Sequence, residues 1–204
     1  MDDFKFEIDE GRVFITGYTG AGGDVVVPST LGGLPVTNIG YRAFYNCRGL
    51  TRITLPNSVT TIGHRAFFRC CGLIRITLGN NIIDIGEWAF YGCTSLTSIT
   101  LPNSIATIGY RAFKGCTGLT NITLPNSITT IGHYAFMDCT GLTSITFGNS
   151  LTDIGKSAFQ GCIRLTSINL PDRVTDIGDN AFLNCHGLTP RTLDTIAMVR
   201  RGIL

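Results

Sequence analysis

Residues 119–141 read LTNITLPNSITTIGHYAFMDCTG, and close variants of this stretch recur along most of the 204-residue chain. The dipeptide Ile-Gly occurs once in each copy, and each step from one occurrence to the next is 23 residues. It begins at Ile39, Ile62, Ile85, Ile108, Ile131, Ile154 and Ile177. Six complete units therefore span residues 39–176, and a seventh begins at residue 177. Because the spacing never slips between residues 39 and 188, no linker is expected within that range.

Each unit divides into a strand half and a turn half. Residues 96–101 (LTSITL) alternate apolar with polar side chains towards their end and are rich in Ile and Thr, which predicts a β-strand with one buried face. Residues 102–104 (PNS) follow as a turn, because proline presets φ and asparagine bonds its own backbone. Residues 112–116 (AFKGC) are predicted to form a single helical or 3₁₀ turn that packs inward.

One unit cannot bury its apolar face alone, so neighbouring units must stack and form columns of like residues. The largest side chains of these columns form a phenylalanine spine: Phe44, Phe67, Phe90, Phe113, Phe136, Phe159 and Phe182. We therefore predict an α/β, β-rich fold, a right-handed solenoid of about seven 23-residue coils with parallel strands. The asparagines of the turns, such as Asn57 and Asn80, are expected to bond the backbone of adjacent coils.

The first coil needs a cap, because its edge and core would otherwise face water. Residues 1–38 are predicted to be an N-terminal capping segment ahead of a solenoid that covers residues 39–188. Within that segment, residues 4–15 are expected to form a β-hairpin with its turn at residues 9–11.

The repeat pattern breaks near the other end, where Arg191 stands in place of a buried isoleucine. Residues 189–204 are predicted to be a C-terminal cap. In this interpretation Thr192 is the N-cap of a short helix over residues 193–201, and Gly202 ends that helix. The alternative is that the natural protein continues beyond this point.

The repeated Leu-x-x-Ile-x-Leu-Pro strand, followed by Ile-Gly-x-x-Ala-Phe-x-x-Cys, resembles the BspA-like leucine-rich repeats, the 23-residue type also named after Treponema pallidum. The likeness covers residues 39–188 and is specific, since it recurs at least six times. The resemblance implies a leucine-rich-repeat solenoid that is not an enzyme but binds proteins or glycans, with a role in adhesion at the cell surface or in a secreted protein. Residues 1–5 (MDDFK) do not look like a signal peptide, which leaves a cytoplasmic location open.

The composition favours a folded chain without catalytic machinery. Of the 204 residues, 44% are hydrophobic and 15% are charged, and the net charge is +2. No run approaches the roughly 18 uninterrupted apolar residues that a membrane span needs. His64 and His133 share a column but would lie about 14 Å apart, too far to share a metal ion. We predict no catalytic residues, no metal and no cofactor.

Seven of the eight cysteines form one column behind the phenylalanine spine, at Cys47, Cys70, Cys93, Cys116, Cys139, Cys162 and Cys185. Stacked cysteines point in parallel, which strains disulfide closure, and a buried thiol behaves as a small hydrophobe that needs no partner. Buried free thiols are therefore predicted, with a disulfide framework as the alternative. Cys71 stands outside the column.

Two columns of exposed residues are candidate ligand-binding surfaces. The first lies on the strands, where Arg52 and Arg75 precede a row of serine and threonine hydroxyls. The second follows each Ile-Gly dipeptide and carries Arg, Tyr and Trp, which are enriched in binding hot spots. The candidate residues of the two columns are Arg42, Arg52, Arg65, Arg75, Trp88, Tyr110, Arg111 and Tyr134. The alternative is ordinary variation on a solvated surface.

Positive charge is concentrated in residues 39–84, where six arginines face one aspartate, a balance of +5. A protein or an anionic glycan as ligand would offset the repulsion among them. Nucleic acid fits less well, because the total charge is only +2 and no groove-reading element is visible. Two other functions stay open: a structural spacer or self-assembling homo-oligomeric array, and an ice-binding face of strand hydroxyls.

Overall fold

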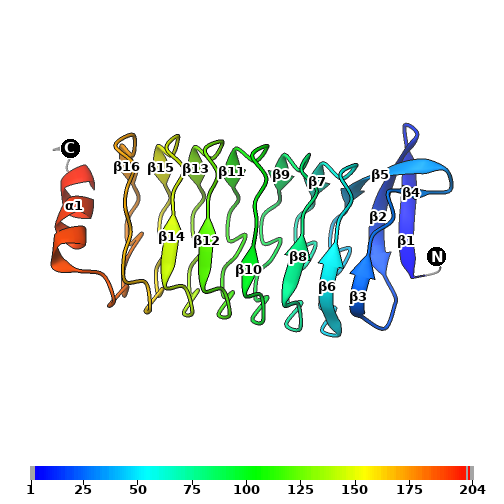
Figure 1. The fold of residues 1–204 in the computed structure, drawn as a ribbon, viewed down its shortest axis with the longest axis horizontal. Helices are drawn as coiled ribbons and strands as arrows, with labels where there is room; N and C mark the ends of the chain where they lie inside the picture. Colours follow the sequence, from blue (N-terminus) through cyan, green and yellow to red (C-terminus); the bar gives the residue numbers. More distant parts are fainter. Residues whose placement is uncertain (1–2, 201, 203–204) are drawn as a thin grey trace.

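A computed structural model describes residues 3–200 and residue 202. The chain winds into an elongated solenoid with a hairpin at its N-terminal end and a helix at the other (Figure 1). The predicted fold class is confirmed, with about seven coils of about 23 residues behind an N-terminal antiparallel hairpin. We number the coils from the isoleucine of each Ile-Gly dipeptide, so that coil 1 begins at Ile39 and coil 7 at Ile177.

The coils contribute short strands to two ladders that run along the solenoid, and each ladder is interrupted once. The first ladder contains β3 (Gly23–Val26), β6 (Leu50–Thr54), β8 (Arg75–Thr77), β10 (Ser98–Ile99), β12 (Asn121–Thr123) and β14 (Ser144–Thr146). The second ladder contains β7 (Thr61–Ile62), β9 (Asp84–Ile85), β11 (Thr107–Ile108), β13 (Thr130–Ile131), β15 (Asp153–Ile154) and β16 (Asp176–Ile177). The interruptions arise because β10 does not pair with β12, nor β9 with β11. Pairing between coils is parallel and joins equivalent residues, as Ile53 faces Ile76.

The N-terminal segment extends the second ladder by four strands. These are β1 (Phe4–Asp9), β2 (Arg12–Tyr18), β4 (Thr30–Leu31) and β5 (Leu34–Ile39), and the sheet runs β1-β2-β5-β7-β9 with β4 paired to β5. The predicted hairpin is confirmed, because β1 and β2 pair antiparallel around a two-residue turn. Glu10 and Gly11 have φ of 46° and 72°, as a type I′ turn requires.

The core consists of the stacked columns that the repeat predicts. The phenylalanine rings from Phe44 to Phe159 are fully buried, and Phe182 in coil 7 is 7% exposed. Successive rings stack with centroids 5.0 to 5.3 Å apart. Such contacts add about 0.5–1.5 kcal/mol each to the free energy gained by burying the rings. This spine therefore ties every coil to the next.

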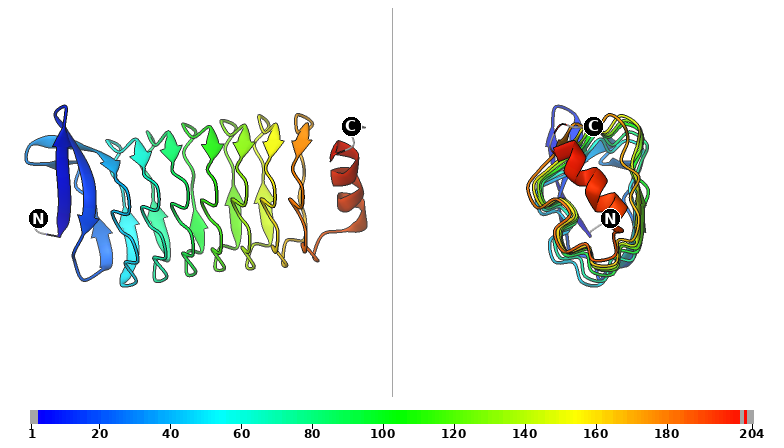
Figure 2. Two further views of the ribbon diagram at one scale, coloured as in Figure 1. Left: turned by 180° about the vertical axis from the view of Figure 1, so that it is seen from behind. Right: turned by 90° about the vertical axis from the view of Figure 1, so that its left-hand side faces the viewer.

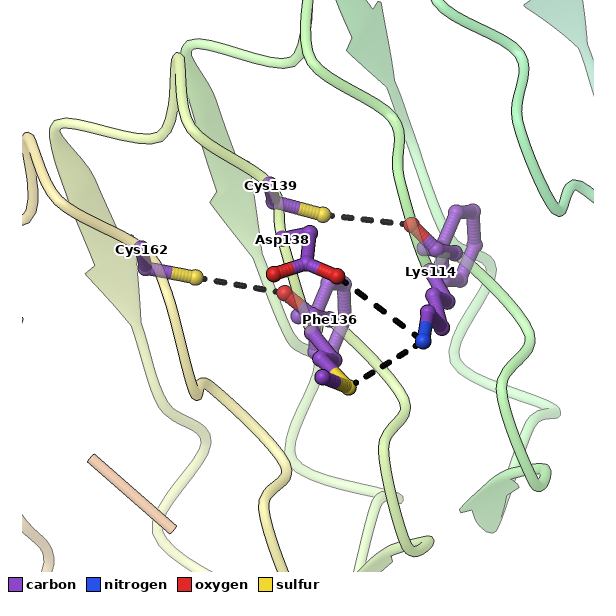
Figure 3. Close-up of polar contacts among 7 residues, drawn as sticks. Lys114, Phe136, Asp138, Cys139 and Cys162 are labelled. Carbon is purple, nitrogen blue, oxygen red and sulfur yellow. Dashed lines mark hydrogen bonds and ion pairs between the residues drawn. The ribbon is translucent and has the colours of Figure 1, made fainter. Parts of the chain in front are cut away.

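The cysteine column is also confirmed as free thiols, six of them buried and Cys47 half-buried. The sequence did not indicate that these thiols form hydrogen bonds. Each buried thiol donates to the backbone carbonyl oxygen of the phenylalanine in the preceding coil, as Cys139 does to Phe113 and Cys162 to Phe136, with Sγ–O distances of 3.1 and 3.2 Å (Figure 3). Burial raises the pKa of the Cys139 thiol well above its usual range, so the column stays protonated and uncharged.

The Ala-Phe-x-x-Cys segment is not the predicted helical or 3₁₀ turn. Its backbone N–H groups alternate in direction: Ala112 donates to Gly109 in the same coil, and Phe113 donates to Ala135 in the next. A helical turn directs all of its N–H groups along its own segment, so it would leave the neighbouring coil unbonded. Positive φ at Arg111 and at Gly115, 53° and 73°, produces the alternation.

The C-terminal helix begins earlier than predicted. Helix α1 spans Pro190–Arg200, and its N-cap is Thr189, whose Oγ1 accepts a hydrogen bond from the Thr192 N–H at 3.3 Å. Proline suits the first helical position because its missing N–H would have no partner there. Gly202 follows the helix with φ of 65°, as predicted for a terminator, and residue 201 lies outside the described residues.

Candidate interaction surfaces

The eight candidate residues lie on two separate walls of the solenoid. Arg52 and Arg75 are in register on β6 and β8 of the first ladder. The other six lie in the turns that follow the second strand of each coil. Among residues 3–200, no hydrogen bond, ion pair or ring contact joins the two sets. The candidate residues therefore belong to two sites rather than one.

The turn residues form a row in which guanidinium groups and aromatic rings alternate. One equivalent position in coils 1 to 5 carries Arg42, Arg65, Trp88, Arg111 and Tyr134. Rings beside them complete the row: Tyr41, Tyr45, Phe68, Tyr91 and Tyr110. We call these ten residues the arginine–aromatic ladder.

Arg111 has the most extensive contacts in the ladder. Its Cζ lies 4.5 Å from the ring centroid of Trp88 in the preceding coil. Two further centroids, those of Tyr110 and Tyr134, lie 4.7 and 4.9 Å from the same atom. Each such cation–π contact is worth about 0.5–1 kcal/mol at an exposed site and more when water is excluded. The rings therefore hold the guanidinium of Arg111 in one position.

Arg65 is held in the same way, with its Cζ 5.3 Å from the Trp88 ring centroid and 5.7 Å from that of Phe68. The Nε atoms of Arg65 and Arg111 are buried and have no hydrogen-bond partner within the described chain. No carboxylate there pairs with either side chain; the ion pairs of the described residues involve other groups. Both cations are consequently fixed in place without being neutralised.

The backbone at this column makes its choice of side chains informative. Arg65, Trp88 and Tyr134 have φ between 57° and 59°, a region in which asparagine and glycine are favoured and bulky residues are uncommon. Coil 7 carries Asn180 at the equivalent position, with φ of 59°. The left-handed conformation is therefore a feature of every repeat. The backbone does not require the large side chains that coils 1 to 5 carry at this position.

The positive charge of Arg52 and Arg75 on the first ladder is partly neutralised, which the sequence did not indicate. Arg52 Nη1 lies 3.1 Å from Oδ2 of Asp24, which β3 places directly beside it. Hydrogen bonds from Arg52 and Thr51 lower the pKa of the Asp24 carboxyl below its usual range. The balance of +5 for residues 39–84 omitted this aspartate, because it lies outside the repeats in sequence. Arg75 has no ion-pair partner among the described residues.

A cleft of about 300 Å³ lies beside Arg75, where β8 of coil 2 pairs with β10 of coil 3. Its walls also carry Ile76, Thr77, Leu78, Asn80, Ser98, Thr100 and Pro102. Between coils 1 and 2 the Leu55 N–H donates to the Thr77 carbonyl at 2.9 Å. The equivalent N–H of Leu78 makes no such bond to coil 3. The residues that line the cleft are mostly polar, and Arg75 is the only charged one among them.

Sequence reasoning missed Tyr45, Phe68 and Tyr91 as members of the ladder. Their rings stack in a row, with centroids 5.2 Å apart from Tyr45 to Phe68 and 4.8 Å from Phe68 to Tyr91. The signal was present, because each follows a spine phenylalanine directly and so recurs at the 23-residue spacing. His133 also has a structural contact that spacing did not indicate, since its Nδ1 accepts the Lys156 N–H at 2.9 Å.

The described residues contain no group of three or more His, Cys, Asp or Glu side chains that could hold a metal ion. None of their helices is long and apolar enough to cross a membrane. What the fold presents is a rigid repeat core with variable side chains in surface columns. These features define a leucine-rich-repeat solenoid.

The comparisons with known proteins agree. The family described as "BspA type Leucine rich repeat region (6 copies)" matches residues 33–117 and 60–189, and the chain belongs to this family. A leucine-rich repeat protein of T. pallidum is 36% identical, with a TM-score of 0.93 over 97% of this chain and 93% of the other. No match is found among curated protein sequences.

Two longer relatives have the same fold. A leucine-rich cell surface protein of Faecalibacterium prausnitzii is 35% identical, with a TM-score of 0.83, and the alignment covers 93% of this chain and 52% of that one. A leucine-rich repeat protein of Bacteroides ovatus is 34% identical, with a TM-score of 0.85, over 92% of this chain and 51% of that one. The chain thus spans about half the length of these two relatives.

Proposed function

We propose that this chain is a non-enzymatic binding module that recognises an anionic partner, an acidic protein surface or an anionic glycan, through the arginine–aromatic ladder. A role in adhesion at a bacterial cell surface is part of the proposal. It is supported by membership of the BspA-type family and by the relative from F. prausnitzii, which is described as a cell surface protein.

The observation that carries the proposal is the pair of fixed, unneutralised cations at Arg65 and Arg111. A side chain already held against rings loses little conformational entropy when a ligand binds it. The Nη groups of an arginine can donate two parallel hydrogen bonds to a carboxylate or a sulfate. The surrounding Trp88 and Tyr110 rings add the amphipathic contact area that is common in binding hot spots.

The test compares two double variants with the same loss of charge. Arg65→Ala with Arg111→Ala removes two cations from the ladder, and Arg52→Ala with Arg75→Ala removes two from the first ladder of strands. Both are applied, beside the unchanged protein, to immobilised heparin and to immobilised poly-glutamate, and the salt concentration at elution is measured. Circular dichroism and thermal melting check that each variant is folded.

We expect the unchanged protein and the Arg52/Arg75 variant to elute from at least one matrix above about 0.3 M salt, where long-range screening is strong. The Arg65/Arg111 variant should elute well below that. Elution of all three proteins at low salt from both matrices would refute an anionic partner. Loss of retention in the Arg52/Arg75 variant alone would move the site to the cleft beside Arg75.

A further inference from the structure

The two ends of the second ladder are finished differently. At the C-terminal end, α1 packs against β16 and buries Ile196 and Val199, so a helix lies across the last coil (Figure 2). At the N-terminal end the last strand is β1, which pairs with β2 on one side only. None of the described strands pairs with its other edge. An uncovered edge strand offers unpaired backbone groups to a further strand.

The register of the hairpin identifies which backbone groups are free. Asp9 and Arg12 flank the two-residue turn and therefore form a hydrogen-bonded pair. Because bonding alternates along an antiparallel strand, the N–H and C=O groups of Phe6 and Ile8 point away from β2. At the other end of β1, the Thr19 N–H donates to the Asp3 carbonyl at 2.8 Å. The backbone groups of Asp3 therefore point towards β2, and those of Phe4 point away from it.

The exposed edge is both regular and apolar. The irregularity in the β1–β2 pairing skips Thr16 of β2, so β1 itself is uninterrupted. Phe4 packs edge-on against Phe44, the first ring of the spine, with centroids 6.5 Å apart. Along the same face of β1, Phe6 and Ile8 follow but are 39% and 56% exposed. The apolar face of the solenoid therefore continues onto β1 and ends there uncovered.

We propose that β1 pairs antiparallel with β1 of a second copy of this chain, about a two-fold axis perpendicular to the sheet at Phe6. The outward-pointing backbone groups of Phe4, Phe6 and Ile8 then bond those of the partner. A two-fold axis in this direction keeps the apolar faces of both strands on the same side. The exposed rings and the isoleucines consequently cover one another, and two solenoids join end to end.

The apolar residues and the charges of β1 together select this register over its neighbours. With Phe6 opposite Phe6 of the partner subunit, Lys5 lies opposite Glu7 of the partner subunit, and symmetry produces this pair twice. A shift of two residues in one direction would place Lys5 opposite Asp9 of the partner subunit, but it would also oppose the two Glu7 residues and leave Phe4 with no apolar residue opposite it. The reverse shift would oppose the two Lys5 residues and place Asp3 opposite Glu7 of the partner subunit. Opposite charges directly across a ladder stabilise it, and like charges destabilise it. Asp3 lies opposite Asp9 of the partner subunit, also twice, and this repulsion at the two ends of the paired segment offsets part of the attraction.

Charge exchange tests the proposal directly. The full chain is studied by sedimentation equilibrium over micromolar to millimolar concentrations as the unchanged protein, Lys5→Glu, Glu7→Lys and the double exchange. We expect a monomer–dimer equilibrium, weakened about tenfold or more in each single variant because two attractive pairs become repulsive. The double exchange, which restores opposite charges, should recover dimerisation. Lys156→Glu, on an exposed side chain of coil 6, makes the same charge change far from β1 and should have no effect.

A second variant addresses the apolar contact. Ile8→Lys keeps β1 folded, because the side chain is largely exposed in the single chain, but places a cation in the paired face. We expect it to be monomeric and as thermally stable as the unchanged protein. A monomer at every concentration of the unchanged protein would overturn the proposal. A dimer that the single charge variants leave intact, or that the double exchange fails to recover, would overturn it equally.

Discussion

Coils 1 to 5 and coils 6 to 7 have the same backbone and core but different surfaces. Phe113 in coil 4 and Phe159 in coil 6 are both fully buried and stack on the spine rings of the coils beside them, with Phe159 also contacting Phe147 edge-on. At the left-handed position of the turn, however, coil 4 carries Arg111 and coil 7 carries Asn180. The core is thus repeated because stacking requires it, while the surface column is free to vary, and only its first five coils carry large cationic and aromatic side chains.

This difference indicates which surface position of the repeat is a candidate for a function. Asn180 is the kind of residue that the backbone alone favours at positive φ. Ser157 in coil 6, at the same position, is buried and small. Arginine, tryptophan and tyrosine at the preceding positions have no conformational advantage, so their presence requires an explanation in terms of what the side chains contact.

The largest expected effect tests whether the core is equivalent in the two regions. Phe113→Ala and Phe159→Ala each remove a fully buried ring from the spine, so each should lower the free energy of unfolding by about 3–5 kcal/mol. Urea denaturation followed by circular dichroism measures both. A difference between the two larger than their scatter would break the equivalence. Phe182→Ala, in the more exposed coil 7, should cost less.

The cysteine column predicts that stability falls at alkaline pH in both regions. Burial raises the pKa of the Cys185 thiol from 9.0 to about 11 and raises that of Cys116 well above its usual range. Above pH 9 the unfolded chain therefore binds fewer protons than the folded one, so the free energy of unfolding must decrease as the pH rises.

The measurement is urea denaturation at intervals from pH 8 to pH 11, with Cys185→Ala as the control. In that variant the free energy of unfolding should decrease less between pH 9 and about 11, because one thiol with a raised pKa has been removed. An unchanged pH dependence in Cys185→Ala would contradict a protonated thiol at this site.

The smallest expected effect sharpens the contrast between the two surfaces. Arg111→Ala removes contacts with three rings and should lower the free energy of unfolding by about 1 kcal/mol. Arg164→Ala in coil 6 removes an exposed side chain that has no partner among the described residues. This variant should change the free energy of unfolding by less than about 0.5 kcal/mol. Thermal melting of the two variants side by side decides the comparison, and equal shifts would show that the ring contacts contribute nothing.

The fold could be predicted from the sequence because a fixed 23-residue spacing leaves one way to bury Phe113 and its equivalents. The turn conformation could not, since Arg111 and Tyr134 carry no preference for the positive φ that they adopt. Bonding between coils imposes that conformation. The start of α1 was missed because Thr192 resembled an N-cap, although Pro190 at the first helical position favours Thr189.

The candidate sites could be predicted only as columns. Spacing places Trp88, Arg65 and Arg111 in one row, but the ring-to-guanidinium contacts depend on side-chain directions that spacing does not determine. The pairing of Asp24 with Arg52 was missed for a different reason. It joins a non-repeat strand to coil 1, and no internal periodicity connects those two segments.

The most direct test of the account observes the arginines themselves while a ligand binds. Nuclear magnetic resonance of the arginine Nε–H groups is recorded during titration with poly-glutamate. We expect the signals of Arg65 and Arg111 to shift together and saturably, while those of Arg164 and Arg173 in coil 6 do not. Uniform small shifts of every arginine, or saturable shifts confined to Arg52 and Arg75, would contradict the claim that the arginine–aromatic ladder is the binding surface.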